Sequence, residues 1–240
     1  MSSLLPTRFL FRFSAPCRYR DPIWPPTGGE LDESYRLANL AELEGRTAWA
    51  DVRAAWNEAG LAMALLVHGK RLPPASDPSR PEQTDGLHVW IDTRDVRNVH
   101  RAGRFCHRFA FLAPDVTSDP TARAAAGRSS RVARAPSRKR EGGATKCEAL
   151  FLPIHRAREL PRPVAPESLQ TRCQVLKDGY FLEALIPADA LTGFDPAEHP
   201  RLGFAYAVLD RELGEQTFGV GNPMPYREDP SLWATLDLVR

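Results

Sequence analysis

The sequence predicts an all-β protein, an antiparallel β-sandwich of about ten or eleven short strands. Apolar and polar residues alternate with a two-residue period in several short runs, as expected for strands that bury one face. The 240 residues include 22 prolines and 16 glycines, which are typical of a chain with many turns. The spacing of these runs favours one domain over residues 1–240.

Residues 85–92 give the clearest strand, with the sequence Asp-Gly-Leu-His-Val-Trp-Ile-Asp. One face of this strand is aliphatic and is formed by Leu87, Val89 and Ile91. The other face carries His88, Trp90 and Asp92. We therefore expect the aliphatic face in the core and the second face open to solvent or to a ligand.

The N-terminal part is predicted to begin with a strand at residues 7–13, which places three phenylalanines on one face. The prolines that follow, beginning with Pro16, are expected to interrupt regular structure. Residues 37–43 are compatible with either a short helix or a strand, and the pattern does not decide between them.

A hairpin is predicted next, with strands at residues 51–56 and 61–68 around a short loop that ends in Gly60. The second strand would direct Leu61, Met63, Leu65 and Val67 to one side. Residues 103–112 resume alternation, with Phe105, His107, Phe109 and Phe111 on the core face and Arg104, Cys106 and Arg108 on the other. His107 is expected to be a core histidine with one backbone partner.

Residues 115–144 lack hydrophobic periodicity and are rich in Ala, Arg, Ser and Gly, so we expect a mobile insertion. Residues 121–140 hold seven basic and no acidic residues, and without them the net charge of +2 becomes −5. A solvated loop is favoured over a nucleic-acid site because no aromatic residues for base stacking are interleaved. Contact with a macromolecular partner is the alternative.

The C-terminal part supplies the remaining strands, predicted at residues 147–155, 171–176, 180–186, 202–210, 216–220 and 232–239. Lys177-Asp178-Gly179 forms a tight turn between two of them. Residues 187–191 are predicted to form one helical turn with proline near its start.

Three motifs together resemble the family 9 carbohydrate-binding modules and the wider DOMON-like group. They are the runs at residues 85–92, Gly-Tyr-Phe-Leu-Glu-Ala-Leu-Ile-Pro at 179–187 and Gly-Phe-Ala-Tyr-Ala-Val-Leu-Asp at 203–210. The resemblance spans roughly residues 48–239 without the insertion, and it implies an antiparallel β-sandwich. In this family a sugar lies between two tryptophans above the open sheet face, which implies a carbohydrate or another small polar ligand.

The sugar-contacting positions of the family carry different residues in this chain. The resemblance aligns the first clamp tryptophan with Glu82, the second with a position near Gly219, and the glutamate of the first motif with His88. A basic residue of the partner strand aligns with Arg108, or with Arg104 if the register slips by one pleat. The scaffold is therefore expected to be kept while the two-tryptophan clamp is not.

The predicted ligand site consists of His88, Trp90, Arg104 and Arg108, because arginine offers a planar donor fork to anionic or hydroxyl-rich ligands. The alternative is that these residues pack beneath a loop. The function predicted is non-catalytic ligand binding, and the second hypothesis is an interaction protein that contacts a macromolecule. Glu183 and Asp210 are the carboxylates that a glycosidase would need, but their matches in the family are structural.

No metal site or cofactor is expected, since Cys106 and His107 point to opposite faces of one strand. The four cysteines, Cys17, Cys106, Cys147 and Cys173, include no Cys-x-x-Cys pair. Reduced thiols in the cytoplasm are predicted, with Cys106 and Cys147 as the pair that an oxidising compartment would join. Neither a signal peptide nor a membrane span is expected.

Overall fold

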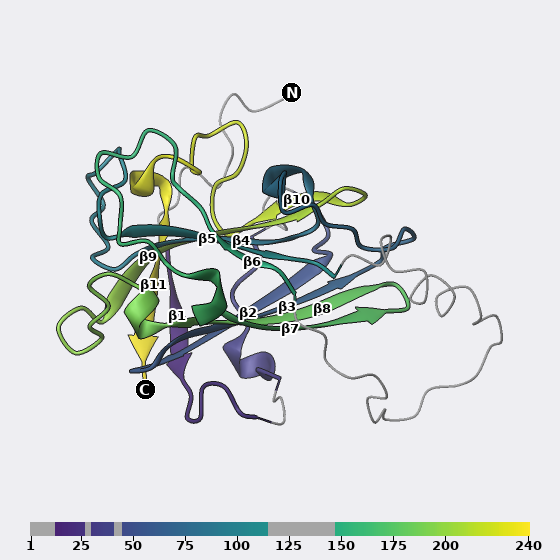
Figure 1. Cartoon of the computed structure of the whole chain (residues 1–240), viewed down its shortest axis with the longest axis horizontal. Helices are drawn as coiled ribbons and strands as arrows, with labels where there is room; N and C mark the ends of the chain where they lie inside the picture. Colours follow the sequence, from purple (N-terminus) through teal and green to yellow (C-terminus); the bar gives the residue numbers. More distant parts are fainter. Residues whose placement is uncertain (1–12, 27–29, 41–44, 115–146) are drawn as a thin grey trace.

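The computed structural model describes residues 13–26, 30–40, 45–114 and 147–240, in which eleven strands form one continuous folded sheet (Figure 1). The strands are β1 (Ser14–Tyr19), β2 (Ala50–Asn57), β3 (Gly60–His68), β4 (Gly86–Asp92), β5 (Cys106–Leu112), β6 (Ala149–Phe151), β7 (Gln170–Leu176), β8 (Gly179–Pro187), β9 (Arg201–Asp210), β10 (Gly214–Thr217) and β11 (Ala234–Val239). Short 3-10 turns lie at Glu33–Tyr35, Pro81–Gln83, Pro166–Ser168, Ala188–Ala190 and Pro230–Leu232. The predicted all-β class is confirmed.

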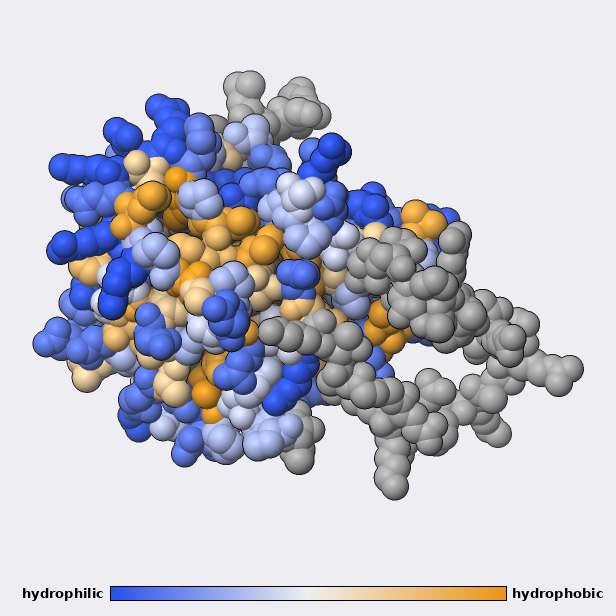
Figure 2. All heavy atoms as spheres, viewed as in Figure 1, coloured by the Kyte–Doolittle hydropathy of each residue, from blue (hydrophilic) through white to orange (hydrophobic). Residues whose placement is uncertain are grey.

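The sheet folds into two layers that enclose the main core. One layer has the order β6-β5-β4-β9, with β10 and β11 along the far side of β9, and the other has the order β2-β3-β8-β7. The aliphatic face of β4 lies in this core with the predicted face of β3, as Leu87, Val89, Ile91, Leu61, Met63, Leu65 and Val67 are all buried there. Figure 2 shows apolar side chains gathered in the middle of this view, with polar side chains around them.

Strand β1 connects the two layers and corrects two expectations. It pairs with β11 and with β2, and both pairings are parallel, so the sandwich is not wholly antiparallel. Pro16 lies inside β1, where a break was expected. It is tolerated because β2 pairs with β1 only at Arg18 and Tyr19, so the missing N–H of Pro16 removes no bond to β2.

Several predicted elements differ in extent from those observed. The hairpin of β2 and β3 and the turn near residues 187–191 are confirmed, the latter as a 3-10 turn. The strand predicted at residues 147–155 is reduced to three residues of β6, and the one at residues 216–220 is replaced by β10. Residues 37–40 form neither a helix nor a strand. Residues 1–12, which contain nearly all of the first predicted strand, and the insertion at residues 115–144 lie outside the described part of the chain.

Glycine is required where β8 begins beside β3. A Cβ atom added at Gly179 would lie 1.9 Å from the backbone oxygen of Val67, so two paired strands would have to move apart. Gly179→Ala should therefore lower the free energy of unfolding by roughly 1–3 kcal/mol in a urea titration. Gly103→Ala is the control, because nothing lies within 4 Å of a Cβ there, and an effect as large in the control would contradict the steric argument.

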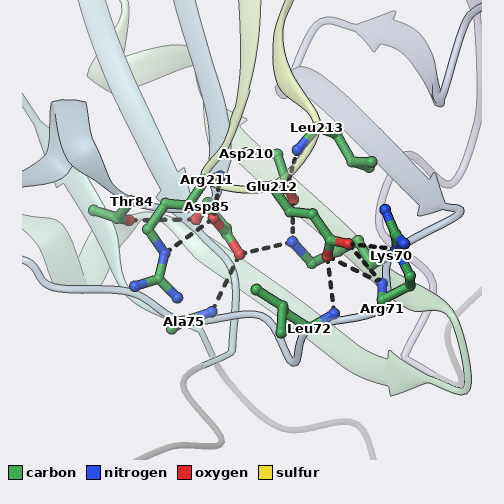
Figure 3. A network of polar contacts seen from close by, with 10 residues as sticks. All are labelled: Lys70, Arg71, Leu72, Ala75, Thr84, Asp85, Asp210, Arg211, Glu212 and Leu213. Carbon is green, nitrogen blue, oxygen red and sulfur yellow. Dashed lines mark hydrogen bonds and ion pairs between the residues drawn. The ribbon is translucent and has the colours of Figure 1, made fainter.

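A buried ion network joins the two layers at one end of the sandwich (Figure 3). Lys70 follows β3, and its Nζ lies 3.1 Å from Asp85 Oδ2 and 2.5 Å from Asp210 Oδ2. Asp85 precedes β4 and Asp210 ends β9, so this single ammonium group bridges the layers. All three side chains are at most 2% exposed.

The cysteines pair differently from the prediction. Cys147, just before β6, forms a disulfide with Cys173 of β7, while Cys106 and Cys17 are free and buried. The predicted Cys106–Cys147 pair is wrong because Cys106 lies on the outer face of its layer, whereas Cys147 and Cys173 lie in the core between the layers. The disulfide therefore joins the two end strands of the folded sheet.

Candidate functional site

The outer face of β4, β5 and β9 is covered by a second apolar cluster rather than open. Trp90, Cys106, Ala205, Ala207 and Leu209 from the strands pack against Ile154, Val220, Tyr226 and Trp233. These covering residues belong to the connections at residues 152–158 and 220–233, and Figure 1 shows both on the outer side of this layer.

The expectation of an exposed binding face is therefore wrong for its central residues. His88 is 0% exposed, Trp90 is 1% and Arg108 is 7%. Their position on the face opposite the main core is as predicted, and three of the four predicted site residues are in contact with each other. The burial comes partly from residues that were predicted to lie in strands. The strands β6 and β10 end earlier than predicted and β11 begins later, so Ile154, Val220 and Trp233 lie in the connections that cover this face.

Trp90 supports the guanidinium of Arg108. The two residues are direct partners across β4 and β5, and Arg108 Cζ lies 5.1 Å from the centre of the indole ring. The Tyr226 ring meets the indole edge to face at 5.5 Å. Because cation–π contact is strongest where water is excluded, the buried indole, which packs against Tyr226, stabilises the guanidinium of Arg108.

His88 fixes the other side of the same guanidinium. Its Nε2 lies 3.1 Å from the backbone oxygen of Pro81, so we assign the proton to Nε2, and Nδ1 then accepts from Arg108 Nη2 at 3.3 Å. Burial, followed by the positive charge of Arg108, lowers the pKa of His88 to about 3. The imidazole is therefore neutral at neutral pH and is able to accept this hydrogen bond.

Glu82 connects the buried arginine to the surface. Arg108 Nη2 donates to Glu82 Oε1 at 2.6 Å, and Arg227 Nη1 donates to Glu82 Oε2 at 2.5 Å. Partial burial acts to raise the pKa of Glu82, but the hydrogen bond and charge of Arg108 outweigh it and the pKa is lowered. The carboxylate is thus ionised and lies between two guanidinium groups.

Arg227 is held by a second acidic group behind this pair. Its Nη2 lies 3.0 Å from Glu215 Oε1, and the hydroxyl of Tyr226 donates to the same carboxylate. Burial and the nearby Glu215 carboxylate raise the pKa of Tyr226, which keeps the phenol protonated. Two carboxylates and two arginines therefore form one connected network at the rim of the apolar cluster.

Some donor capacity in this cluster is unused. Among the described residues, no hydrogen-bond partner is found for Trp90 Nε1 or for Arg108 Nε. A buried N–H group without an acceptor costs about 1–3 kcal/mol. The cluster therefore holds donors that an oxygen-rich ligand or a bound water would satisfy.

Arg104, the fourth predicted site residue, is separate from this cluster. It is exposed and precedes β5, and its guanidinium stacks on the Phe105 ring at 5.0 Å. Three residues of the network, Glu82, Glu215 and Arg227, were not among the predicted site residues. Glu82 had a signal, since the resemblance aligned it with a clamp position, whereas nothing in the sequence around Arg227 distinguished it.

The other candidates from the sequence, His107, Glu183 and Asp210, make structural contacts away from this cluster. His107 accepts a hydrogen bond from the backbone N–H of Thr192 at 2.9 Å and stacks on Phe109, which confirms a core histidine with a backbone partner. Glu183 lies near Arg172 on β7, whereas Asp210 belongs to the buried Lys70 network, so the two carboxylates share no pocket.

A search of the described residues finds no cluster of three His, Cys, Asp or Glu side chains arranged to hold a metal ion. The same part of the chain contains no helix with the length and apolar character needed to span a membrane.

The fold of this chain is similar to the folds of solved carbohydrate-binding modules. No protein-family model and no curated protein matches the sequence. A family 9 carbohydrate-binding module from Caldicellulosiruptor kristjanssonii, solved in complex with cellotriose, is similar over 94% of this chain and 93% of that chain, with a TM-score of 0.55 and 14% identity. A family 9 carbohydrate-binding module from the same organism, solved in complex with glucose, is similar over 94% of this chain and 95% of that chain, with a TM-score of 0.55 and 13% identity.

A third solved structure is less similar. A putative carbohydrate-binding protein from Bacteroides uniformis matches 79% of this chain and 78% of its own, with a TM-score of 0.41 and 12% identity. The first two matches extend over almost the full length of both chains. This chain therefore has the β-sandwich fold of the family 9 carbohydrate-binding modules.

Proposed function

We propose that the chain is a non-catalytic binding module that takes a carbohydrate at the rim formed by Glu82, Arg108 and Arg227. One observation carries the proposal. Glu82, His88 and Arg108 are the residues that the sequence resemblance aligned with sugar-contacting positions, and all three meet around one guanidinium. The turn Pro81–Gln83 and the paired strands β4 and β5 thus bring these three positions together on the outer face of their layer.

The chemistry of the rim suits a hydroxylated ligand. Sugar hydroxyls both donate and accept, and here a carboxylate acceptor lies beside two planar arginine donors. Glu82 is 44% exposed at its side chain and Arg227 is 28% exposed, so a ligand reaches them from solvent. Trp90 is too deeply buried to stack on the ligand, and its role is to position Arg108.

Arg108→Ala should weaken binding of cellotriose or glucose by about ten-fold or more, because hydrogen bonds to charged groups contribute roughly 1.5–3 kcal/mol. Isothermal titration calorimetry on the full chain measures this effect. Arg104→Ala is the matched control and should bind as the unchanged protein does, since Arg104 lies outside the network.

Arg227→Ala tests the same rim with less risk to folding, because Arg227 is more exposed than Arg108. It should also weaken binding. Full affinity in both the Arg108 and Arg227 variants, with unchanged circular dichroism, would refute this location for the site. Absence of sugar binding by the unchanged protein would refute the function itself.

A further inference from the structure

Glu82 occupies the place that a ligand carboxylate would take. Its two oxygens are divided between Arg108, which comes from β5, and Arg227, which comes from the connection at residues 220–233. Distances of 2.6 Å and 2.5 Å are those of charge-assisted hydrogen bonds. The two guanidinium groups thus form a pair of donors that fits a planar group with two acceptor oxygens.

The position of Glu82 in the chain allows its carboxylate to move away from the two arginines. It belongs to the 3-10 turn Pro81–Gln83, which contains no buried residue, and its side chain is 44% exposed. Rotation about its own side-chain bonds is enough to move the carboxylate into water. Glu82 is the more exposed partner in both ion pairs, so water competes with its carboxylate and a ligand with more contacts can displace it.

The arginines would stay in place when Glu82 moves. Arg108 is held by His88 and by the Trp90 ring, and Arg227 is held by Glu215 and stacks near Tyr226. Without the Glu82 carboxylate, Glu215 is the one acidic side chain in the network, which leaves a net positive charge beside a preformed donor fork. Arg108 Nε supplies a further donor that has no partner among the described residues.

We propose that the rim selects a sugar that carries a carboxylate, a hexuronate, whose carboxylate replaces that of Glu82 between Arg108 and Arg227. The inference rests on the proposed function and names its ligand class. A carboxylate is favoured over a tetrahedral anion because Glu82 shows that two coplanar oxygens match the spacing of the two arginines. The sugar hydroxyls then face the exposed rim.

The test compares glucuronate with glucose, which differ at the carboxylate carbon alone, by calorimetry on the full chain. Glu82→Gln keeps the size of the side chain and removes its charge, so it should bind glucuronate about ten-fold more tightly than the unchanged protein does. Its affinity for glucose should fall, because the carboxylate that accepts hydrogen bonds from the sugar hydroxyls at this rim is lost, so the ratio of the two affinities should shift towards glucuronate. Arg227→Ala should reduce the preference for glucuronate, and Arg104→Ala should preserve it.

The outcomes separate this inference from the proposed function. Equal affinity for glucose and glucuronate in Glu82→Gln would overturn the hexuronate proposal and leave carbohydrate binding standing. Acetate that competes as well as glucuronate would show that the sugar is not recognised, which also overturns the proposal. Binding of neither sugar by any variant would overturn the proposed function together with this inference.

Discussion

Lys70→Met should lower the free energy of unfolding by about 3–5 kcal/mol, because it leaves two buried carboxylates without their shared counter-ion. Lys70 Nζ contacts Asp85 Oδ2 and Asp210 Oδ2, and both carboxylates are essentially inaccessible to solvent. Methionine fills a similar volume, so the loss reports the charge rather than a cavity. Urea unfolding followed by circular dichroism measures it.

The remaining contacts of the network cannot replace the lysine. Asp85 also accepts from the backbone N–H groups of Ala75 and Arg211, and Asp210 accepts from those of Glu212 and Leu213. These bonds orient the two carboxylates, as Figure 3 shows, but they bring no neutralising charge to Asp210. Two like charges in one buried site would then repel each other.

A control variant and a double variant test whether the buried charge is the cause of the lost stability. Lys177→Met removes an exposed lysine from the turn between β7 and β8 and should stay within about 0.5 kcal/mol of the unchanged protein. Lys70→Met combined with Asp210→Asn should be more stable than Lys70→Met alone, since it removes the charge of Asp210, whereas Asp85 keeps Arg211 Nε at 3.5 Å. A Lys70→Met protein as stable as the Lys177→Met protein would show that the buried ion pairs do not hold the layers together.

The sequence was informative where a local period decides the structure. Leu87, Val89 and Ile91 of β4 face the main core because side chains alternate along a strand, and this alternation is visible in seven residues. The hairpin of β2 and β3 and the core position of His107 follow for the same reason. These predictions required no knowledge of distant segments.

The state of the outer face could not be predicted because it depends on distant connections. Tyr226 and Trp233 cover Trp90 from more than a hundred residues away, and the alternation within β4 carries no information about either of them. A polar and aromatic strand face has the same local pattern whether solvent or a loop lies over it. The sequence thus placed His88 and Arg108 on the right face but not at the right depth.

The sequence left Arg104 open as an alternative to Arg108 for a related reason. The two residues share one face in the alternating pattern, but β5 begins at Cys106, so Arg104 lies before the strand. Propensity does not fix the ends of strands, and glycine at 103 with the bond from Cys106 N–H to Gly103 oxygen forms a turn there. Only the residue opposite Trp90 in the strand register joins the cluster.

Replacing both Cys147 and Cys173 with serine should lower the free energy of unfolding by roughly 3 kcal/mol, the effect expected for a closed loop of this length. The two cysteines are 26 residues apart in sequence and join β6 to β7, the end strands of the folded sheet. The hydroxyl of Thr171 bonds both the N–H and the C=O of Cys147, so the serine variant keeps part of this junction. Urea unfolding with and without dithiothreitol measures the effect.

The reductant supplies the control, because it should destabilise the unchanged protein by a similar amount and leave the double variant unaffected. A thiol count on the denatured, unreduced protein should find two free thiols, from Cys17 and Cys106. Four free thiols would refute the pairing. Structural disulfides persist in oxidising compartments, so two free thiols in protein taken from its native source would argue for such a compartment and against the cytoplasm.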